Sequence, residues 1–482
     1  MIVMKRSIAL IAAASLAGCV SVPTTEPHRV PVVPPAAFVA AAPEVPLDRW
    51  WTAWGDPALD RLVERALAAN QDLRLAADRV RMARAMAAVA ESALYPTIAA
   101  GGAAWVSGGS GTINGELGQI LSAYPGSATG SVGNGQILGL GAAWDPDVFG
   151  GRHADRDAAR AIVLAASDIA AGMRIMIAAD VVENWQQTAG LKRRLALLDQ
   201  GIASADALIG YVRARMAAGQ TDAAALAHAE AARARIAAQR PALVELIAIR
   251  QRRLAVLAGD LPEAAVDVPA DSGIVIPPAP GGGLPAAVLA RRPDVRAAEA
   301  GVIAAAAHLK SLESDLKPHF TIVLGDGEGH IGLTGIPGYD GHMAVAGIGG
   351  SVPLFNAGRL RARVVGGDAE LDAMMAVADR ATLGALEDVE AAGSLRHGAD
   401  LAHGVRETAR IAADRQTSVT DALFRAGRRT LGDVLEARLA AIADADSVEQ
   451  ARIAQGSATV QFYRALGGGW DVPPVRKGPS AP

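Results

Sequence analysis

The sequence Val352-Pro353-Leu354-Phe355-Asn356-Ala357-Gly358-Arg359 opens the stretch that decides the fold, and Leu466-Gly467-Gly468-Gly469-Trp470 closes it. No further proline occurs until Pro473, although the chain of 482 residues contains 26 prolines. Because proline breaks the interior of a helix, this gap predicts one very long helical hairpin. From Gly358 to Gly427 the chain can form a helix of about 100 Å, at about 1.5 Å per residue. A single globular domain does not need a rod of that length.

Composition excludes several classes of protein. The formal net charge is −4, whereas nucleic-acid-binding proteins usually carry a basic surface, so we expect no nucleic-acid partner. Past the N-terminus we find no run of about 18 apolar residues, so we expect no transmembrane helix, and any membrane contact must come from strands or a lipid. No Ser/His/Asp set, paired acid–base signature or phosphate-cradling glycine loop stands out. We therefore expect neither an enzyme nor a cofactor-binding protein.

The N-terminus has the features of a signal peptide. The basic pair Lys5-Arg6 precedes a short apolar run, Ile8 to Leu16, which is too short to be a spanning helix. The following Leu-Ala-Gly-Cys resembles a bacterial lipoprotein signal, which is cleaved before a cysteine that then carries lipid. Cys19 is the only cysteine, which excludes an intramolecular disulfide and a multi-cysteine metal site. The alternative is an incidental cysteine in a discarded signal.

These features predict that residues 1–18 are removed and that 19–49, rich in proline, form a lipidated, extended tether. By the same resemblance, Val20 rather than Asp after the cysteine fits sorting to the outer membrane. The covalent lipid on Cys19 is the only bound group that we expect.

Residues 50–260 form a first unit that contains a β-hairpin between 96 and 149. Its strands, Thr97–Val106 and Ile137–Trp144, flank a Gly/Ser/Asn-rich loop. Strands of about 9 to 11 residues have the length that a tilted strand needs to cross a bilayer. A soluble hairpin with glycines at bends or bulges is the alternative. A helical hairpin over 151–260 follows, with its tip near Gly219, and a proline-rich linker spans 261–285.

The pattern then repeats. Matching residues recur 222 positions later, as in Asp72 and Asp294, Arg74 and Arg296, and Pro96 and Pro318. Beyond the hairpins the offset is 208, from Gly219 to Gly427, because the first hairpin loop is longer. This self-similarity predicts an internal duplication. The second repeat spans 286–470, with a β-hairpin over 318–356, a helical hairpin over 358–466 whose tip is near Gly427, and a tail over 471–482.

Two β-hairpins supply four strands in each chain. A transmembrane sheet must close so that no edge faces lipid, and single-chain barrels start at about eight strands. If these strands cross a membrane, the chain must therefore assemble with other copies. An apolar stripe on a rod of about 100 Å also requires neighbours along its length.

Several separated motifs resemble one family, the TolC-like outer membrane efflux factors of the lipoprotein (NodT) type, which serve tripartite pumps with an inner-membrane RND transporter. The motifs that carry the resemblance are Trp51-Thr52-Ala53-Trp54-Gly55-Asp56-Pro57-Ala58-Leu59-Asp60, Trp144-Asp145-Pro146-Asp147-Val148-Phe149-Gly150, Leu289-Ala290-Arg291-Arg292-Pro293-Asp294-Val295-Arg296-Ala297-Ala298-Glu299, Val352 to Arg359, and Ala465 to Trp470.

The resemblance implies a mainly α, internally duplicated fold with a small β part. Long helical hairpins would form an α-barrel through the periplasm, and two transmembrane β-hairpins would contribute four strands to a 12-stranded barrel in a homotrimer. The implied function is a passive exit duct in the outer membrane that conducts small molecules. The implied partners are a periplasmic adaptor protein, an RND-type pump and outer-membrane lipid. Two alternatives are the outer component of type I protein secretion and a lipid-anchored helical scaffold that does not conduct.

By the same resemblance, the helical tips form the periplasmic aperture and dock the adaptor. The tip residues are Arg215, Gly219, Arg425, Gly427, Arg428 and Thr430. The family's acidic constriction falls on Asp433 and Glu436, and three copies of each would form rings that tune the passage of charged solutes. The alternative for these two acids is a solvated helix face whose N-terminal acid is favoured by the helix dipole.

The first tip departs from the family pattern. Six residues beyond Gly219 stands Ala225 and not an acid, and we expect Asp222 to cap the returning helix. His319, His330 and His342 lie in or beside the second hairpin, and we expect Asp326 and Glu328 in its loop. A metal site would need convergent ligands, and we expect none on such a loop.

Overall fold

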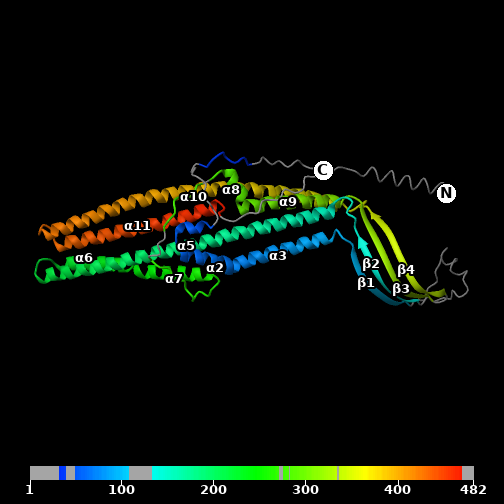
Figure 1. Cartoon of the computed structure of the whole chain (residues 1–482), viewed down its shortest axis with the longest axis horizontal. Coiled ribbons are helices and arrows are strands. Elements are labelled where there is room, and N and C mark those ends of the chain that lie inside the picture. The colour runs from blue at the N-terminus through cyan, green and yellow to red at the C-terminus, as the bar shows by residue number, and fades with distance from the viewer. Residues whose placement is uncertain are drawn as a thin grey trace. The chain divides into compact units, whose positions relative to one another are not determined.

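The computed structural model describes residues 32–38, 49–107, 133–270, 275–281, 283–333 and 336–468. The predicted signal peptide, Cys19 and Trp470 lie outside the described residues. As predicted, the fold is mainly α with a small β part (Figure 1). The elements follow in the order η1 (Trp50–Trp54), α2 (Pro57–Ala69), α3 (Gln71–Ser92), β1 (Thr97–Ser107), β2 (Gly133–Trp144), α5 (Gly151–Ala217), α6 (Ala223–Ala237), α7 (Arg240–Leu257), α8 (Pro285–Arg291), α9 (Pro293–Ser314), β3 (His319–Leu333), β4 (Ile336–Ser351), α10 (Arg359–Arg425) and α11 (Leu431–Ala465).

The described residues fall into two compact units. The sheet unit is built from the described residues within 82–163 and 300–376 and contains the four strands. The helical unit is built from the described residues within 32–81, 164–299 and 377–468 and contains both helical tips. Helices α3, α5, α9 and α10 contribute residues to both units.

The sheet unit is centred on an antiparallel sheet in the order β1-β2-β3-β4. Thr97 pairs with Ala143, Trp144 with Ile322, and His319 with Ser351. Within the described chain, β1 and β4 each pair on one side only, so the sheet is open at two edges.

The second hairpin differs from its prediction. Strands β3 and β4 have 15 and 16 residues, and Asp326 and Glu328, which we predicted in the loop, lie within β3. The reason is a period of two, because glycines alternate with Asp326, Glu328 and His330. Side chains of one strand alternate between faces, so the three polar residues share one face and the glycines the other.

Helices α5 and α10 both contain 67 residues, as expected for duplicated rods. The return from the first tip is not one helix, as we predicted, but two, α6 and α7. The break follows from Pro241, which cannot donate a backbone hydrogen bond and lies in the first turn of α7. In the second repeat α11 returns without a break, and the Thr417 hydroxyl on α10 contacts the Ala437 carbonyl on α11 at 3.1 Å.

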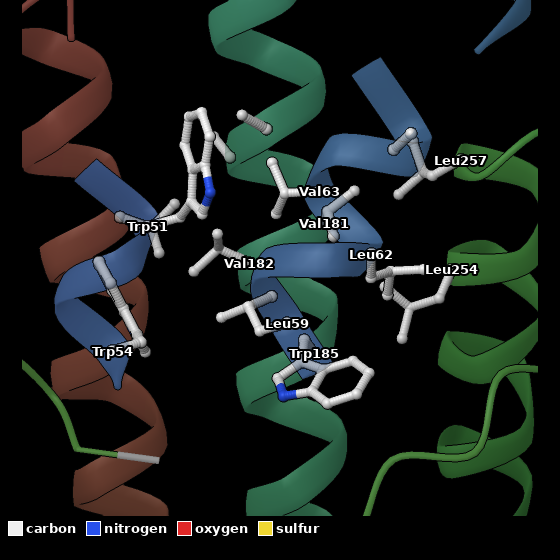
Figure 2. Packing of buried hydrophobic residues seen from close by; sticks show 14 of the residues in the cluster. Trp51, Trp54, Leu59, Leu62, Val63, Val181, Val182, Trp185, Leu254 and Leu257 are labelled. Atoms are coloured by element: carbon white, nitrogen blue, oxygen red, sulfur yellow. The ribbon is translucent and has the colours of Figure 1, made fainter. Parts of the chain in front are cut away.

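The main core lies where η1 and α2 meet α5, α7 and α11 (Figure 2). Trp51 and Trp54 are buried against Leu59 and Val182, and the Trp185 indole N–H donates to the Asp56 carboxylate at 2.9 Å. Fully burying a large apolar side chain contributes about 1.5–3 kcal/mol. The short elements η1 and α2 therefore pack between α5, α7 and α11 and hold these three helices together.

Part of the predicted tether is packed. Phe38 is 4% exposed and lies in a cluster with residues of α8, α10 and α11, namely Val288, Val389, Ala392, Phe462, Ala465 and Leu466. Residues 32–38 have no regular secondary structure, as expected for a proline-rich segment. The tether is therefore fixed to the helical unit at Phe38.

Helix α5 bears on the prediction that no transmembrane helix follows the N-terminus. Helix α5 contains an 18-residue window with mean hydropathy 1.7, apolar enough to cross a membrane by composition, and 22% of that window is buried within the chain. This window is rich in alanine, so it does not stand out in the sequence as an apolar run, although alanine adds to the mean hydropathy. Apolar side chains of α5 that are exposed within the chain include Ile162, Leu164 and Ile169.

Helix α5 packs closely on α11 in the helical unit. A Cβ added at Gly456 would lie 2.5 Å from Oε1 of Gln186, and one added at Gly190 would collide with Ile453. Farther along, Arg193 pairs with Glu449 at 2.7 Å. Small residues thus let the two backbones approach, and ion pairs fix their register.

Each repeat has a joint between helices, and the two joints occupy equivalent positions. The Asn70 side-chain N–H donates to the carbonyl of Leu257 at 3.0 Å, at the end of α7. Arg292, 222 positions later, donates to the carbonyl of Ala465 at 3.0 Å, at the end of α11. Ala465 in turn lies 208 positions after Leu257. The second joint also includes α10, because Arg292 contacts Asp388 at 2.8 Å.

Candidate functional site

The two helical tips end α5 and α10 in the same way. Gly219 and Gly427 both have φ of 71°, a conformation that favours glycine. The N–H of Gln220 donates to the Arg215 carbonyl at 2.9 Å, and the N–H of Arg428 to the Leu423 carbonyl at 2.8 Å. These are the six-to-one hydrogen bonds of the Schellman motif, so each tip is a defined turn. Gly219 thus ends α5, as the sequence predicted.

The returning helices begin with different caps. At the first tip, Asp222 accepts a hydrogen bond from the N–H of Ala225 at 3.0 Å, which confirms the predicted cap. At the second tip, Thr430 accepts from the N–H of Asp433 at 3.2 Å, and Asp433 accepts from the N–H of Thr430 at 2.8 Å. This reciprocal pair is a capping box. The sequence reasoning missed it because it placed Thr430 among docking residues only.

Asp433 is therefore both a capping residue and a candidate gate residue. The N–H and the hydroxyl of Thr430 donate to its carboxylate and lower its pKa below the ordinary value of 3.8, with a smaller contribution from Arg429. A hydrogen bond to the charged form of an acid favours that form. The structure thus keeps a fixed negative charge at the first turn of α11, where the helix dipole also favours it.

Glu436 lies one turn beyond Asp433 on α11 and is exposed. Residues three apart share a helix face, so the two carboxylates project from the same side of α11. No ion pair of Glu436 is present among the described residues, whereas Asp433 has Arg429 at 4.0 Å. The second tip thus presents two neighbouring acids, one committed to a cap and one exposed.

Of the basic tip residues, Arg425 and Arg428 are exposed and Arg215 is partly buried. Arg425 pairs with Asp421 and has 78% of its side chain exposed, and Arg428 is exposed. At the first tip, Arg215 donates to the Gln220 carbonyl at 3.4 Å and lies over the ring of Tyr211, 5.8 Å from its centroid. Each turn therefore displays guanidinium groups beside a rigid backbone.

The structure connects the two tips through a pair of residues that the sequence reasoning missed. A Cβ added at Gly432, in the first turn of α11, would lie 3.0 Å from the ring of Tyr211 on α5. Glycine is unfavourable within a helix. A glycine in the first turn of α11, at position 432, was therefore the sequence signal that another segment approaches this turn closely. Tyr211 thereby supports the helix turn that carries the candidate gate.

The histidines of the second hairpin form pairs and not a metal cluster. His330 lies 2.6 Å from Asp340, and His342 lies 2.8 Å from Asp326, in both cases between β3 and β4. Among the residues that the structure describes, no group of three or more candidate metal ligands converges.

Comparison with known proteins accords with this architecture. The profile of the family described as outer membrane efflux protein matches residues 62–260 and 284–468. The pyoverdine export outer membrane protein OpmQ of Pseudomonas putida is 30% identical over 95% of this chain and 96% of its own length. The cation efflux system protein CusC of Escherichia coli is 25% identical over 95% and 97%.

Among solved structures, the outer-membrane channel OprN has a TM-score of 0.79 at 27% identity, covering 93% of this chain and 99% of its own. The match to the family profile extends over both repeats and both β-hairpins. The TolC-like resemblance of the sequence is thereby confirmed, and with it the outer membrane location. The chain belongs to the outer membrane efflux protein family.

Proposed function

We propose that the chain is the passive exit duct of a tripartite efflux pump and that it works as a homotrimer. The observation that carries the proposal is the open sheet, whose edge strands β1 and β4 each lack a partner on one side within the described chain. Exposed backbone groups at a sheet edge cost several kcal/mol each in lipid, so a spanning sheet must close. Three copies of four strands give the 12-stranded barrel that the family implies.

The side chains of the sheet suit a wall between lipid and water. One face carries exposed Ile98, Leu324 and Ile348 toward one end of the strands. Exposed Leu138 and Leu140 lie farther along this face, where they pair with Glu328 and Asp326. Asp326, Glu328 and His330 lie on the same face farther along β3. The apolar end of this face suits the lipid-facing band of an outer-membrane barrel.

The lipid on Cys19 would complete the attachment to the membrane. From Cys19 to the packed Phe38, the extended chain reaches at most about 65 Å at about 3.4 Å per residue. The tether would thus connect the lipid anchor with the helical unit that holds Phe38.

At the tips, the duct would open to the periplasm and meet its partners. Asp433 and Glu436, in three copies, would form two acidic rings that attract cations and slow anions. Arg215, Gly219, Arg425, Gly427, Arg428 and Thr430 would form the surface that docks a periplasmic adaptor protein. An RND-type pump in the inner membrane would supply the energy and select the substrate, and the duct itself would do no chemistry.

Reconstitution tests the proposal. Purified, lipidated protein in a planar bilayer should form discrete channels, and its native mass should be that of three chains. Replacing both Asp433 and Glu436 by alanine should raise conductance or weaken block by divalent cations. A protein that binds membranes but never conducts would overturn the duct and support a lipid-anchored scaffold.

A further inference from the structure

All four connections between the sheet and the helices lie at one end of the strands. Thr97, the first residue of β1, pairs with Ala143, next to the last residue of β2. His319, the first residue of β3, pairs with Ser351, the last residue of β4. Each connection at this end leads to or from a helix. Since the long helices extend into the periplasm, this end of the sheet faces the periplasmic leaflet of the outer membrane.

The four connections are neighbours in space. The Trp144 indole N–H donates to the Leu94 carbonyl at 2.9 Å, which ties the end of β2 to the first connection. Lys317 Nζ lies 5.6 Å from the centre of the Phe149 ring, which brings the second connection beside the third. The pairing of β3 with β4 places the third beside the fourth. We call these connections together the junction surface, residues 93–96, 145–150, 315–318 and 352–358.

The junction surface exposes large apolar side chains. The exposed fraction is 63% for Tyr95, 61% for Val148, 87% for Leu354 and 89% for Phe355. One exposed apolar side chain needs no explanation, because much of any protein surface is apolar. A group of them in neighbouring loops marks a surface that another molecule covers.

Positive side chains border these apolar residues. Lys317 is exposed in the third connection, and Arg359 and Arg361 are exposed in the first turn of α10. Neither arginine has an ion pair within the part of the chain that the structure describes. A guanidinium group matches the geometry of a phosphate and binds it through two parallel hydrogen bonds. The apolar loop after β4 is thus followed directly by two groups that are suited to phosphate.

The carboxylates of the junction surface are less exposed or paired. Asp147 has 8% of its side chain exposed and accepts from two backbone N–H groups of α5, at 2.8 and 2.9 Å. Asp145 is partly buried and accepts from the N–H of Asp147 at 2.9 Å. Asp315 lies 3.8 Å from the Arg363 guanidinium. The charge that this surface presents to a partner is therefore mainly positive.

We propose that the junction surface binds anionic phospholipid of the periplasmic leaflet. Leu354 and Phe355 would lie among the acyl chains, with Arg359 and Arg361 at the phosphates. The proposal rests on the membrane-spanning sheet of the proposed function, and it adds a site for one class of lipid. Aromatic and apolar side chains beside lysine and arginine are typical of protein surfaces that lie in the membrane interface. Anionic headgroups attract such basic side chains within a short distance of the membrane.

Continuity with the sheet selects lipid as the occupant. The loop that carries Leu354 and Phe355 follows β4, whose Ile348 is exposed at the apolar end of the sheet face. Trp144 and Phe320 lie on that same face at the junction end, since Ile322, opposite Trp144 and Ile348, is two residues from Phe320. Transmembrane barrels carry such aromatic residues at the border of the lipid-facing band. The junction surface thus continues the band that faces lipid.

Spin labels test the apolar part of the proposal. Phe355→Cys in the lipidated protein is labelled with a nitroxide in vesicles of phosphatidylethanolamine and phosphatidylglycerol. Collisions of the label with oxygen, which concentrates in the bilayer, are compared with collisions with a nickel chelate, which stays in water. Ile348→Cys is the lipid reference, Ala218→Cys at the first tip is the water reference, and the parent chain gives the background of Cys19. The oxygen-to-nickel ratio at 355 should exceed that at 218 by at least about threefold.

Spin-labelled lipids test the charged part. The fraction of lipid held at the protein is measured for phosphatidylglycerol and for phosphatidylcholine. The parent protein should prefer phosphatidylglycerol by at least about twofold at low salt, and Arg359→Gln with Arg361→Gln should bring this ratio toward one. Arg380→Gln with Arg415→Gln is the matched control, because both arginines are exposed on the same helix but outside the junction surface. The control should keep the preference of the parent.

The outcomes separate this inference from the proposed function. A label at 355 that is as open to nickel as the label at 218 overturns the lipid contact, and so does a label shielded from both reagents, which would show a protein cover. A preference for phosphatidylglycerol that survives Arg359→Gln with Arg361→Gln overturns the headgroup site. Either result, with the label at 348 in lipid, leaves the duct intact. A label at 348 that is open to nickel and not to oxygen overturns the membrane-spanning sheet itself.

Discussion

Thr430 and Asp433 cap each other at the start of α11, with the N–H of Thr430 donating to the Asp433 carboxylate at 2.8 Å and the N–H of Asp433 donating to the Thr430 hydroxyl at 3.2 Å. The same carboxylate is the first of the two proposed gate acids. Its effect on helix geometry and its effect on ions must therefore be separated by experiment.

Removing the charge and removing the cap should have different results. Asp433→Ala with Glu436→Ala should raise single-channel conductance or weaken divalent-cation block, because both proposed rings lose their charge. Thr430→Ala removes the hydroxyl of the cap and keeps both acids, so cation block should persist. Block that is lost in Thr430→Ala but retained in the double variant would show that turn geometry, not charge, controls passage.

Cation block should depend on pH in a definite direction. In a Glu436→Gln background, Asp433 is the remaining gate acid, and hydrogen bonds from Thr430 hold its pKa below 3.8. A lowered pKa means that the charge is present above that value and disappears only as the pH falls through it. Block should thus be unchanged between about pH 7 and 5 and should fade below pH 4. Bilayer recordings that show half-block near pH 6 would contradict this assignment.

The two repeat joints should differ in their contribution to stability. Arg292 has 9% of its side chain exposed and contacts α9, α10 and α11, so Arg292→Ala should cost about 3 kcal/mol by leaving polar partners unmatched. Asn70→Ala removes a helix cap and one contact with α7, for about 1–2 kcal/mol. Thermal melting of the purified protein should rank the variants in that order. Equal melting shifts would mean that the contacts to α10 add nothing.

Arg292 should also make stability sensitive to acid. Burial opposes the charged form of Asp294, but hydrogen bonds from Arg292 outweigh that effect and lower the pKa of Asp294. The stability from this pair is thus present above the unfolded pKa, about 3.9, and is lost as the pH falls through the folded value. The melting difference between the parent and Arg292→Asn should therefore shrink below about pH 4. A difference that grows in acid would contradict the pairing.

One substitution should have opposite effects at two glycines of α5. Gly190→Ala places a methyl group against Ile453 on α11 and should destabilise the protein by about 1–3 kcal/mol through overpacking. Gly210→Ala meets no atom within 4 Å in the chain and should stabilise by up to about 1 kcal/mol through helix propensity. Melting temperatures of the two variants provide the check. Stabilisation by Gly190→Ala would show that α5 and α11 do not pack as described.

Much of the fold was predictable because its signals are local. Proline-free stretches marked the long helices, and Gly219 and Gly427 marked their ends, since both adopt a positive φ that other residues avoid. The duplication followed from the constant offsets between matching residues of the two repeats. The break between α6 and α7 was also within reach, because Pro241 lies at it, but the overall helical pattern concealed its effect.

Other features depend on contacts between segments far apart in sequence. Asp326 and Glu328 resemble loop residues until their pairing with β2 and β4 places them in a strand. The support that Tyr211 gives to Gly432 joins residues more than 200 positions apart, which no sequence period reveals. Asp433 and Glu436 were found only through the family resemblance, and their role in gating stays a prediction.

We predict above all that the chain assembles into a conducting trimer. Single-channel recording of the lipidated protein in a planar bilayer, with its native mass measured on the same sample, tests this claim most directly. We predict discrete channels from a species of three chains, with stronger cation block than in the Asp433→Ala and Glu436→Ala double variant. A membrane-bound species that is monomeric, or a trimer that never conducts, would contradict it.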